Sequence, residues 1–488
     1  MLQEKIKVNG CEEDKRGRDR KMKIMLILPP SKFVLKDKLG ITSIPLGLAY
    51  LASFVERDNH NVRIVDSPTL RYNIQDIKEE IKKFRPHIIG VTATTSSIYD
   101  AYNVAKAAKE INPGVKVVIG GPHVTFTAKE TLKECPFIDV VVRGEGEETF
   151  RELVNFFRSS TEDAGFLEGV KGITFRDKNE IVETNSRPLI KNLDSIPFPA
   201  YHLLPMEKYR LKNKRFATIM TSRGCPFSCI FCSSSQLFGK TWRARSPENV
   251  IEEIKLLKNE YGVKEIEFLD DTFTLNKKRA KKICELLIKE KLNISWSCSS
   301  RVDTIDESLI EGLKEAGCHT IYVGVESGSQ KILNIIDKGI TLPQIVKTVN
   351  LIKKANLNTI GSFIIGIPGE TVKTIKKTIN FAKKLNPSFV QFSICTPYPG
   401  TKLFEIAKEK GWLLTKDWSK YTILDQVMKI PEMVTTNLNR WLLRAYLSFY
   451  LRPKFILEQL KRKDFLFFIT KKVFATALEY VGVKRQVI

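Results

Sequence analysis

Three cysteines lie close together in the stretch TSRGCPFSCIFCSSS (221–235). Cys225, Cys229 and Cys232 follow the spacing Cys-x3-Cys-x2-Cys, and Gly224 and Pro226 shape the turn that carries them. Three thiolates on one loop can hold three corners of a 4Fe-4S cube and leave the fourth iron open. An open iron is able to bind a substrate or cofactor and pass it an electron. The stretch therefore predicts a redox-active iron–sulfur site.

Two other interpretations of the thiols remain. A structural zinc site is closed and tetrahedral, so it needs a fourth ligand, and the nearest candidates are single residues such as His202 and Cys284. Three buried cysteines also act in some proteins as small hydrophobic side chains. Neither interpretation explains the spacing as well as a cluster does.

The elements around the thiols belong to a repeated pattern. Six β-rich runs alternate with helical segments over about 215–410, and the cysteine loop follows the first run. Repeated βα units of this length predict a partial parallel (β/α)6 barrel with its chemistry at the carboxyl ends of the strands. The polar clusters FLDDTF, SSRVD, GVESGS and GIPGE all stand at such ends.

A second α/β pattern precedes the barrel. Between Lys23 and about residue 160, five β-rich runs alternate with amphipathic segments over 44–58, 74–84, 97–111 and 127–135. This alternation predicts a Rossmann-like, doubly wound parallel sheet. Its strand ends TATTSS, GGPH and GEGEE offer hydroxyls and close backbone approach, which suit a phosphate-bearing or amide-bearing ligand. Plain turns are the alternative explanation for these glycines.

The fold class is therefore α/β, with a doubly wound sheet, a partial barrel and a helical tail. We expect five segments: a basic polar head (1–22), the Rossmann-like domain (23–160), a linker with a hairpin and a proline-rich connector (161–210), the barrel (211–425) and a helical C-terminal region (426–488).

Composition and charge indicate where the protein acts and which partners suit it. The head lacks the apolar middle of a secretory signal, and nine cysteines in an unexported chain indicate reduced thiols, so we expect a cytoplasmic protein. No apolar run reaches the length of a membrane span, because Arg444 and Arg452 interrupt the most apolar segments. The net charge of +24 suits nucleic acid, an anionic membrane or an acidic substrate, but it is spread over lysine-rich helix faces typical of solvated surfaces.

At the cysteine loop the sequence resembles the radical S-adenosylmethionine (SAM) enzymes, since the three cysteines follow a first barrel strand and aromatic Phe231 precedes the last of them. The resemblance implies that the cysteines hold a 4Fe-4S cluster, that the open iron chelates SAM, and that reductive cleavage yields a 5′-deoxyadenosyl radical. It implies that Phe231 lies near the adenine of SAM and that Gly366 and Gly369 contact the nucleoside. It also implies that Asp270 and Asp271 bind the methionyl ammonium and that Arg301 binds the carboxylate. Glu326 and Ser327 are implied contacts of ribose or methionyl groups. Instead of binding SAM, each acidic residue would cap a helix N-terminus or form a surface ion pair.

The chain from 23 to 425 resembles a narrower group, the cobalamin-binding radical SAM enzymes, whose Rossmann-like domain precedes the barrel. The resemblance implies cobalamin contacts at Thr94, Ser96, Gly120, Gly121 and Gly144. One element departs from the group: the loop PPSKFVLKDKLGITSIP contains no cobalt-ligating histidine, and His60 lies beyond the next helix as a surface residue or one leading into a strand. Three outcomes stay open: cobalamin without a protein histidine, another axial ligand, or a lost cofactor.

The predicted function is a cobalamin-dependent radical SAM methyltransferase acting on an unactivated carbon. The alternative is a cyclase or carbon–carbon coupling enzyme that transfers no methyl group. An RNA methylthiotransferase is disfavoured because residues 1–200 hold only Cys11 and Cys135, and a non-catalytic iron–sulfur or nucleic-acid-binding module is the remaining class. We expect a small-molecule or lipid-like substrate and an electron donor such as ferredoxin or flavodoxin; nucleic acid is not an expected partner, and no catalytic residue is assigned.

The C-terminal region is rich in aromatic and basic residues, as in NRWLLRAYLSFYLRPKFILEQLKRKDFLFF (439–468). These helices either pack on the barrel mouth as a lid or lie on an anionic membrane, which basic faces beside Phe and Leu suit. We favour packing. Membrane contact would point to a lipid-like substrate.

Overall fold

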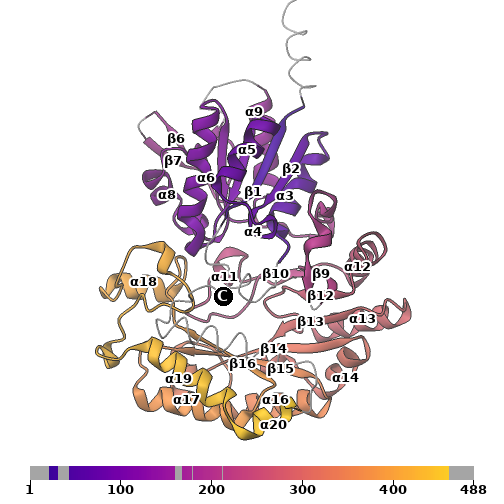
Figure 1. Ribbon diagram of the computed structural model, residues 1–488, viewed down its shortest axis with the longest axis vertical. Helices are drawn as coiled ribbons and strands as arrows, with labels where there is room; N and C mark the ends of the chain where they lie inside the picture. The colour runs from indigo at the N-terminus through magenta and orange to yellow at the C-terminus, as the bar shows by residue number, and fades with distance from the viewer. Residues whose placement is uncertain (1–20, 31–42, 160–166, 179, 212, 461–488) are drawn as a thin grey trace, which may run out of the picture. The chain divides into compact units, whose positions relative to one another are not determined.

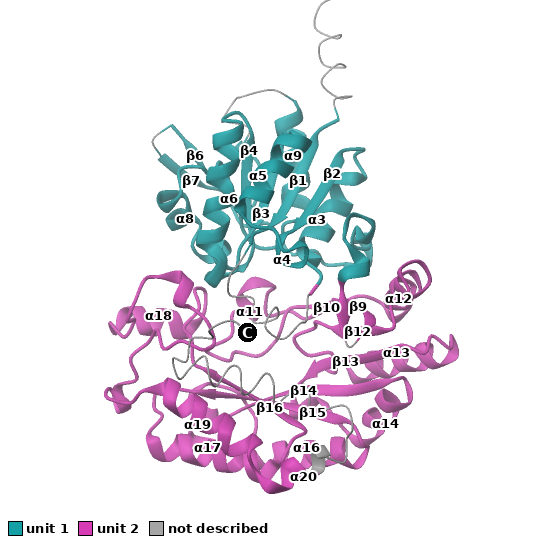
Figure 2. Cartoon of the chain, in the orientation of Figure 1, with its two compact units in different colours: residues 1–33, 44–208 teal, residues 34–43, 209–488 magenta. Residues whose placement is uncertain are grey.

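The computed structural model describes residues 21–30, 43–159, 167–178, 180–211 and 213–460 (Figure 1). The chain divides into two compact units, one formed by residues 1–33 and 44–208 and the other by residues 34–43 and 209–488 (Figure 2). Each unit has its own sheet.

The first unit is a doubly wound sheet with the strand order β2-β1-β3-β4-β5-β6-β7. The pairs among β1 to β5 are parallel, and the order reverses direction at β1, so helices cover both faces of the sheet. The strands are β1 (Lys23–Leu28), β2 (Asn61–Asp66), β3 (Ile88–Thr92), β4 (Lys116–Gly120), β5 (Val140–Val142), β6 (Ile173–Asp177) and β7 (Glu180–Glu183). The helices are α3 (Leu46–Glu56), α4 (Ser67–Leu70), α5 (Ile74–Phe84), α6 (Ile98–Ile111), α7 (Pro122–Phe126), α8 (Ala128–Glu134) and α9 (Glu147–Arg158).

Local sequence explains these elements. In α5, Asn73 caps the first turn by accepting hydrogen bonds from the backbone N–H groups of Gln75 and Asp76, and Ile77 and Ile81 form its buried stripe. The predicted hairpin is present as β6 and β7, which extend the sheet antiparallel to β5. His60 leads into β2 as expected, but it is buried, so a surface position for it was wrong.

The second unit is a partial barrel with the strand order β16-β15-β14-β13-β12-β9-β8. Its six parallel strands confirm the (β/α)6 expectation. The strands are β8 (Arg210–Leu211), β9 (Lys214–Ile219), β12 (Glu265–Phe268), β13 (Ser295–Ser300), β14 (Cys318–Glu326), β15 (Asn358–Ile365) and β16 (Phe389–Ile394), with the small pair β10 (Ser222–Arg223) and β11 (Arg243–Ala244) beside them. The helices are α11 (Ser234–Leu237), α12 (Pro247–Tyr261), α13 (Lys277–Lys289), α14 (Glu307–Glu315), α15 (Gln330–Ile335), α16 (Leu342–Lys354), α17 (Val372–Leu385), α18 (Lys402–Glu409), α19 (Leu438–Tyr450) and α20 (Pro453–Leu460).

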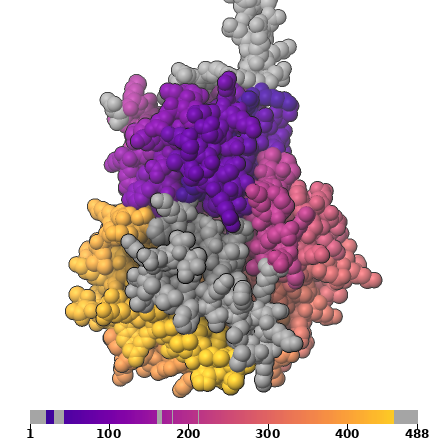
Figure 3. Space-filling model, in the orientation of Figure 1, coloured from indigo at the N-terminus to yellow at the C-terminus, as the bar shows by residue number. Residues whose placement is uncertain are grey.

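Helix α19 closes one edge of this sheet. The hydroxyl of Tyr446 donates to the carbonyl of Phe392 and accepts its N–H, at 2.9 and 3.0 Å, and Tyr450 does the same for Val390. The two phenols thereby satisfy the edge strand β16, which would otherwise present free backbone groups. The tail therefore packs on the barrel, at its edge strand, while α19 and α20 still reach the surface in yellow in Figure 3. The rest of the predicted tail, 461–488, lies outside the described residues.

None of the described helices has both the length and the apolar character that a membrane span needs.

Candidate iron–sulfur and SAM site

The cysteine loop starts at a turn that only glycine fits. Gly224 has φ +88°, and a Cβ atom there would lie 2.4 Å from the carbonyl oxygen of Thr241. The next residue, Cys225, donates its backbone N–H to Gly239 at 3.3 Å. The loop then passes Ile230, whose N–H donates to Ile336 and whose carbonyl accepts from Leu403. Residues far apart in the sequence therefore fix the path of the loop.

The three cysteines are free thiols and are partly accessible to solvent. Burial raises the pKa of each, to about 11 for Cys232, so they stay protonated until a cationic metal centre displaces the protons. Within the described ranges, no three Cys, His, Asp or Glu side chains converge closely enough for a single metal ion. Three thiols on one short loop are the donor set that a 4Fe-4S cluster with one open iron requires.

The two neighbouring aspartates after β12 have different surroundings. Asp270 is buried and accepts hydrogen bonds from the backbone N–H and the hydroxyl of both Thr221 and Ser222. It anchors the start of the cysteine loop. Asp271 is exposed and accepts a hydrogen bond from Ser234, two residues beyond Cys232. Partial desolvation raises the pKa of Asp271. The exposed carboxylate of Asp271 is therefore available for the predicted contact with the SAM ammonium. The carboxylate of Asp270 instead makes its hydrogen bonds to Thr221 and Ser222.

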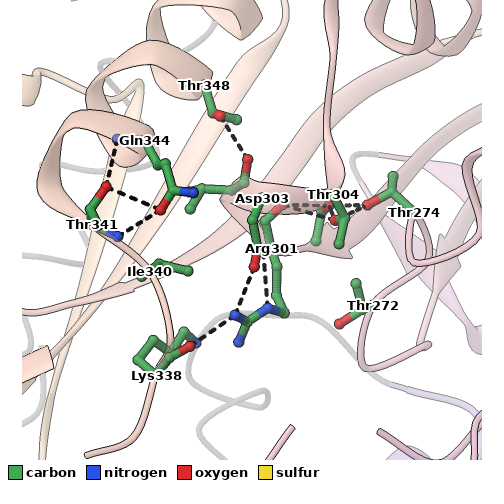
Figure 4. A network of polar contacts seen from close by, with 12 residues as sticks. Thr272, Thr274, Arg301, Asp303, Thr304, Lys338, Ile340, Thr341, Gln344 and Thr348 are labelled. Atoms are coloured by element: carbon green, nitrogen blue, oxygen red, sulfur yellow. Dashed lines mark hydrogen bonds and ion pairs between the residues drawn. The ribbon is translucent and has the colours of Figure 1, made fainter. Parts of the chain in front are cut away.

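Arg301 contacts two polar partners, Asp303 and Lys338, which Figure 4 shows, and one aromatic ring. Its guanidinium makes two 3.0 Å hydrogen bonds to Asp303 and one of 2.8 Å to the carbonyl of Lys338. The same group lies 3.5 Å from the ring centre of Phe227, a cation–π contact inside the loop itself. Arg301 thus links β13, the turn at Lys338 and the cysteine loop.

A buried ion pair lies beside the loop. Lys338 Nζ donates to Glu326 Oε1 at 2.6 Å, and both side chains are more than nine-tenths buried. The ammonium also lies 5.9 Å from the ring centre of Phe231. Burial disfavours the ammonium, but the Glu326 carboxylate outweighs this effect and the pKa of Lys338 is raised. Phe231, the predicted adenine contact, and Glu326, the predicted ribose contact, therefore both neighbour the Lys338 ammonium.

Glu326 and the GIPGE turn adopt unusual backbone conformations. Glu326 has φ +63° at a bulge of β14, and Gly366 and Gly369 have φ +85° and +89°. Glu370 is fully buried and accepts hydrogen bonds from the N–H groups of Gly366 and Ile367, while its Oε1 has no partner. Ser327 is also buried, bonded to Thr378 and to the N–H of Ser329. These two side chains build the strand ends rather than line them.

In the first unit the predicted cobalamin residues come together at neighbouring strand ends. The N–H of Gly144 donates to Thr125 Oγ1 at 3.1 Å, and that hydroxyl donates to the carbonyl of Gly121 at 2.9 Å. Gly121 has φ +111°, and a Cβ atom there would lie 2.6 Å from the carbonyl of Ala93. Thr94, Ser96 and Gly120 are at least partly exposed at the same ends of β3 and β4. This cradle suits an amide-bearing or phosphate-bearing ligand. Most of the loop that departs from the group by containing no histidine (29–45) lies outside the described residues, which omit 31–42.

Sequence reasoning missed Lys338, Phe227 and Glu370. Lys338 stands in the polar turn IIDKGI and carries no motif of its own. Its importance follows only from its contact with Glu326. Glu370 is the last residue of the GIPGE motif, in which the glycines alone carry the resemblance.

Comparisons with known proteins agree with both units. Residues 219–382 match the radical SAM superfamily, and residues 34–154 match the B12 binding domain. The chain is 52% identical over 90% of its length to "Uncharacterized methyltransferase PH0819" of Pyrococcus horikoshii, covering 95% of that protein. It is 32% identical over 84% of its length to the anaerobic magnesium-protoporphyrin IX monomethyl ester cyclase of Rubrivivax gelatinosus, covering 74% of that protein.

Among solved structures, the cobalamin-dependent SAM radical enzyme OxsB, with aqua-cobalamin and SAM bound, has the same fold. The TM-score is 0.75 with 17% identity, and the match covers 98% of this chain and 75% of OxsB. The three-cysteine loop, the glycine cradle of the first unit and these matches agree. The chain belongs to the radical SAM enzymes that carry a B12-binding domain.

Proposed function

We propose that this protein is a cobalamin-dependent radical SAM methyltransferase that acts on an unactivated carbon. The observation that carries the proposal is the pairing of a B12-binding domain with a three-cysteine loop in one chain. The methyltransferase name of the 52% identical relative supports methyl transfer. When bound, the cluster supplies the electron that cleaves SAM to the 5′-deoxyadenosyl radical, and cobalamin carries the methyl group.

The side chains of the site have separate tasks in this proposal. Cys225, Cys229 and Cys232 hold the cluster, and Asp271 binds the ammonium of SAM. Phe231 lies along the adenine, and the strained turns at Gly366 and Gly369 let the backbone approach the nucleoside. Lys338 pairs with the Glu326 carboxylate and holds it at the strand end, where the carboxylate accepts a hydrogen bond from a ribose hydroxyl.

The main role proposed for Arg301 differs from the contact with the SAM carboxylate that the resemblance implies. Asp303 and Phe227 already hold its guanidinium, so its task is to brace the loop, with the SAM carboxylate as a further ligand. For the cofactor of the first unit, Thr94, Ser96, Gly120, Gly121 and Gly144 form the cobalamin contacts. We place the reaction in the cytoplasm, with a ferredoxin or flavodoxin as electron donor.

The test uses protein purified without oxygen and analysed for iron, sulfide and corrinoid. The loaded protein, reduced with dithionite in the presence of SAM, should form 5′-deoxyadenosine. Absence of 5′-deoxyadenosine from fully loaded protein would contradict a radical SAM enzyme.

A second candidate function is cyclisation without methyl transfer, which the name of the 32% identical relative favours. Methyl-labelled SAM separates the two. Label in the product supports the methyltransferase, whereas product without label supports the cyclase.

A further inference from the structure

Helix α19 is buried on one side and exposed on the other. The buried side packs on the edge strand β16 through Tyr446 and Tyr450. The opposite side borders an open groove of about 420 Å³. Six residues at helical spacing line this groove: Arg440, Leu443, Arg444, Leu447, Ser448 and Leu451. The helix therefore carries a second leucine stripe, which faces away from the core of the barrel.

Apolar side chains are exposed beside the groove. Leu451, the last of the lining residues, is 55% exposed, and Ile456 and Leu457 in α20 are 41% and 60% exposed. Helix α20 packs against α19, so these side chains belong to the same region of the second unit (Figure 1). A single exposed leucine is ordinary on a protein surface. Several of them beside a leucine-lined groove are typical of a face that binds another surface.

The same region is basic. Arg440 and Arg444 are exposed at the groove, and the Arg444 guanidinium lies 5.1 Å from the ring centre of Trp441. Helix α17 packs beside α19, and its exposed lysines are Lys373, Lys376, Lys377 and Lys384. Neither α17 nor α19 contains an acidic residue, whereas α12 contains four and α14 contains three. These two helices therefore present positive charge without compensating carboxylates.

We propose that the α19 groove, the exposed apolar residues of α20 and the lysines of α17 form a face that binds an anionic membrane surface. Leucines beside arginines and lysines suit the boundary between acyl chains and charged headgroups. Tryptophan is enriched at that boundary, where Trp441 and its cationic neighbour would lie. Each cation close to an anionic bilayer adds attraction. This inference goes beyond the proposed function and does not depend on it.

Two other occupants fit the face less well. The segment that follows α20 in the sequence, 461–488, contains seven lysine or arginine residues and two acidic ones, so its charge has the same sign as the face. An acidic protein would complement the charge, but anchoring pockets and fixed hydrogen-bonding groups specify such a partner. The polar residues that line the groove are Ser448 and two long, flexible arginines. A fluid anionic surface requires no fixed partner groups.

The test measures sedimentation of the full chain with two kinds of vesicle, phosphatidylcholine alone and an equal mixture of phosphatidylcholine and phosphatidylglycerol. The chain should bind the anionic vesicles more tightly, and added salt should weaken this binding by screening the charges. Arg440→Gln/Arg444→Gln should weaken it about 25-fold, because about 1 kcal/mol for each cation is about fivefold. Leu451→Ser should weaken it about fivefold through the loss of apolar contact.

Matched controls lie on α13, which follows β12 rather than the edge strand β16. Lys278→Gln/Lys282→Gln removes two exposed charges at the same spacing, and Ile288→Ser replaces an apolar side chain that is 39% exposed. Both variants should bind the anionic vesicles as the unmodified chain does. Circular dichroism checks that every variant is folded.

Three results would overturn the proposal. The first is the absence of a preference for anionic vesicles. The second is an equal loss of binding in the α13 and α19 variants, which would assign the attraction to the net charge of the whole chain. The third is a loss in Arg440→Gln/Arg444→Gln without any loss in Leu451→Ser, which would indicate an acidic protein or a nucleic acid as the occupant. Because vesicle binding requires no turnover, these results are independent of whether the chain forms 5′-deoxyadenosine.

Discussion

At the scale of single residues, the site depends on charges that are buried together. Glu326 has a left-handed backbone conformation and a carboxylate within 2.6 Å of the Lys338 ammonium. A buried pair adds little net stability, but removing one partner leaves the other charge uncompensated. The main role of the pair is therefore to position the Glu326 carboxylate rather than to stabilise the fold.

Lys338→Met should lower the free energy of unfolding of the barrel unit by about 3–5 kcal/mol, because Glu326 then remains buried without its partner. Urea-induced unfolding measures this loss. The double variant Lys338→Met/Glu326→Gln removes both charges and should recover part of it. Equal losses in the single and double variants would show that the charge of Glu326 is not the cause.

Glu370 predicts a pH dependence of stability. Burial raises its pKa to about 7, against the N–H groups of Gly366 and Ile367, which favour the carboxylate. Since the folded pKa exceeds the unfolded value, the folded state binds the proton more tightly, and this stability is lost as the pH rises through about 7.

Between about pH 5 and pH 8 the protein should lose about 3 kcal/mol relative to Glu370→Gln, which cannot titrate. Unfolding curves of both proteins at several pH values give the difference. A difference that does not change with pH would contradict the raised pKa.

At the scale of elements, the cysteine loop is shaped by a turn that precedes it. Gly224 brings the chain against the carbonyl oxygens of Gly239 and Thr241, near the pair of β10 and β11. The thiols can wrap a cluster only if this turn is kept. Helix and strand propensities play no part in it, because the constraint is a positive φ and a close backbone approach.

Gly224→Ala should therefore lose most of its cluster iron while the far-ultraviolet circular dichroism stays that of the unmodified chain. The control is Gly312→Ala within α14, where a Cβ atom meets no atom within 4 Å. That change should keep the iron and raise stability by about 0.5–1 kcal/mol. Full iron content in Gly224→Ala would show that the turn can relax.

At the scale of the whole molecule, the two units divide the cofactors between them. The cysteine loop lies in the second unit and the glycine cradle in the first, and each unit has its own sheet. Loss of one cofactor should therefore leave the site of the other intact.

Cys225→Ser should bind corrinoid as the unmodified chain does but retain little iron and form no 5′-deoxyadenosine. Iron, sulfide and corrinoid analysis of one anaerobic preparation measures all of these quantities. Cys284→Ser, a change at a buried cysteine of α13, is the control and should keep both cofactors. Loss of corrinoid in Cys225→Ser would contradict independent sites.

The fold class, the six βα units and the cysteine loop could be predicted from the sequence, because periodicity and spacing are local properties that survive without coordinates. The helix over 74–84 and the parallel order of both sheets follow from the same local patterns. The individual roles at the strand ends could not be predicted this way. Asp270 and Asp271 are adjacent and alike in sequence, yet only the fold brings Thr221 and Ser222 to one of them.

Lys338 and the paired strands of the partial barrel show the same limit. Lys338 pairs with Glu326 across a helix and a turn, and Ser299, Tyr322 and Ser362 meet only through the register of three strands. The sequence by itself determined that this protein holds a three-thiolate cluster loop on a barrel behind a Rossmann-like domain. The tertiary structure alone decided which charges neutralise one another and which residues of neighbouring strands lie side by side, because those are contacts between residues distant in the chain.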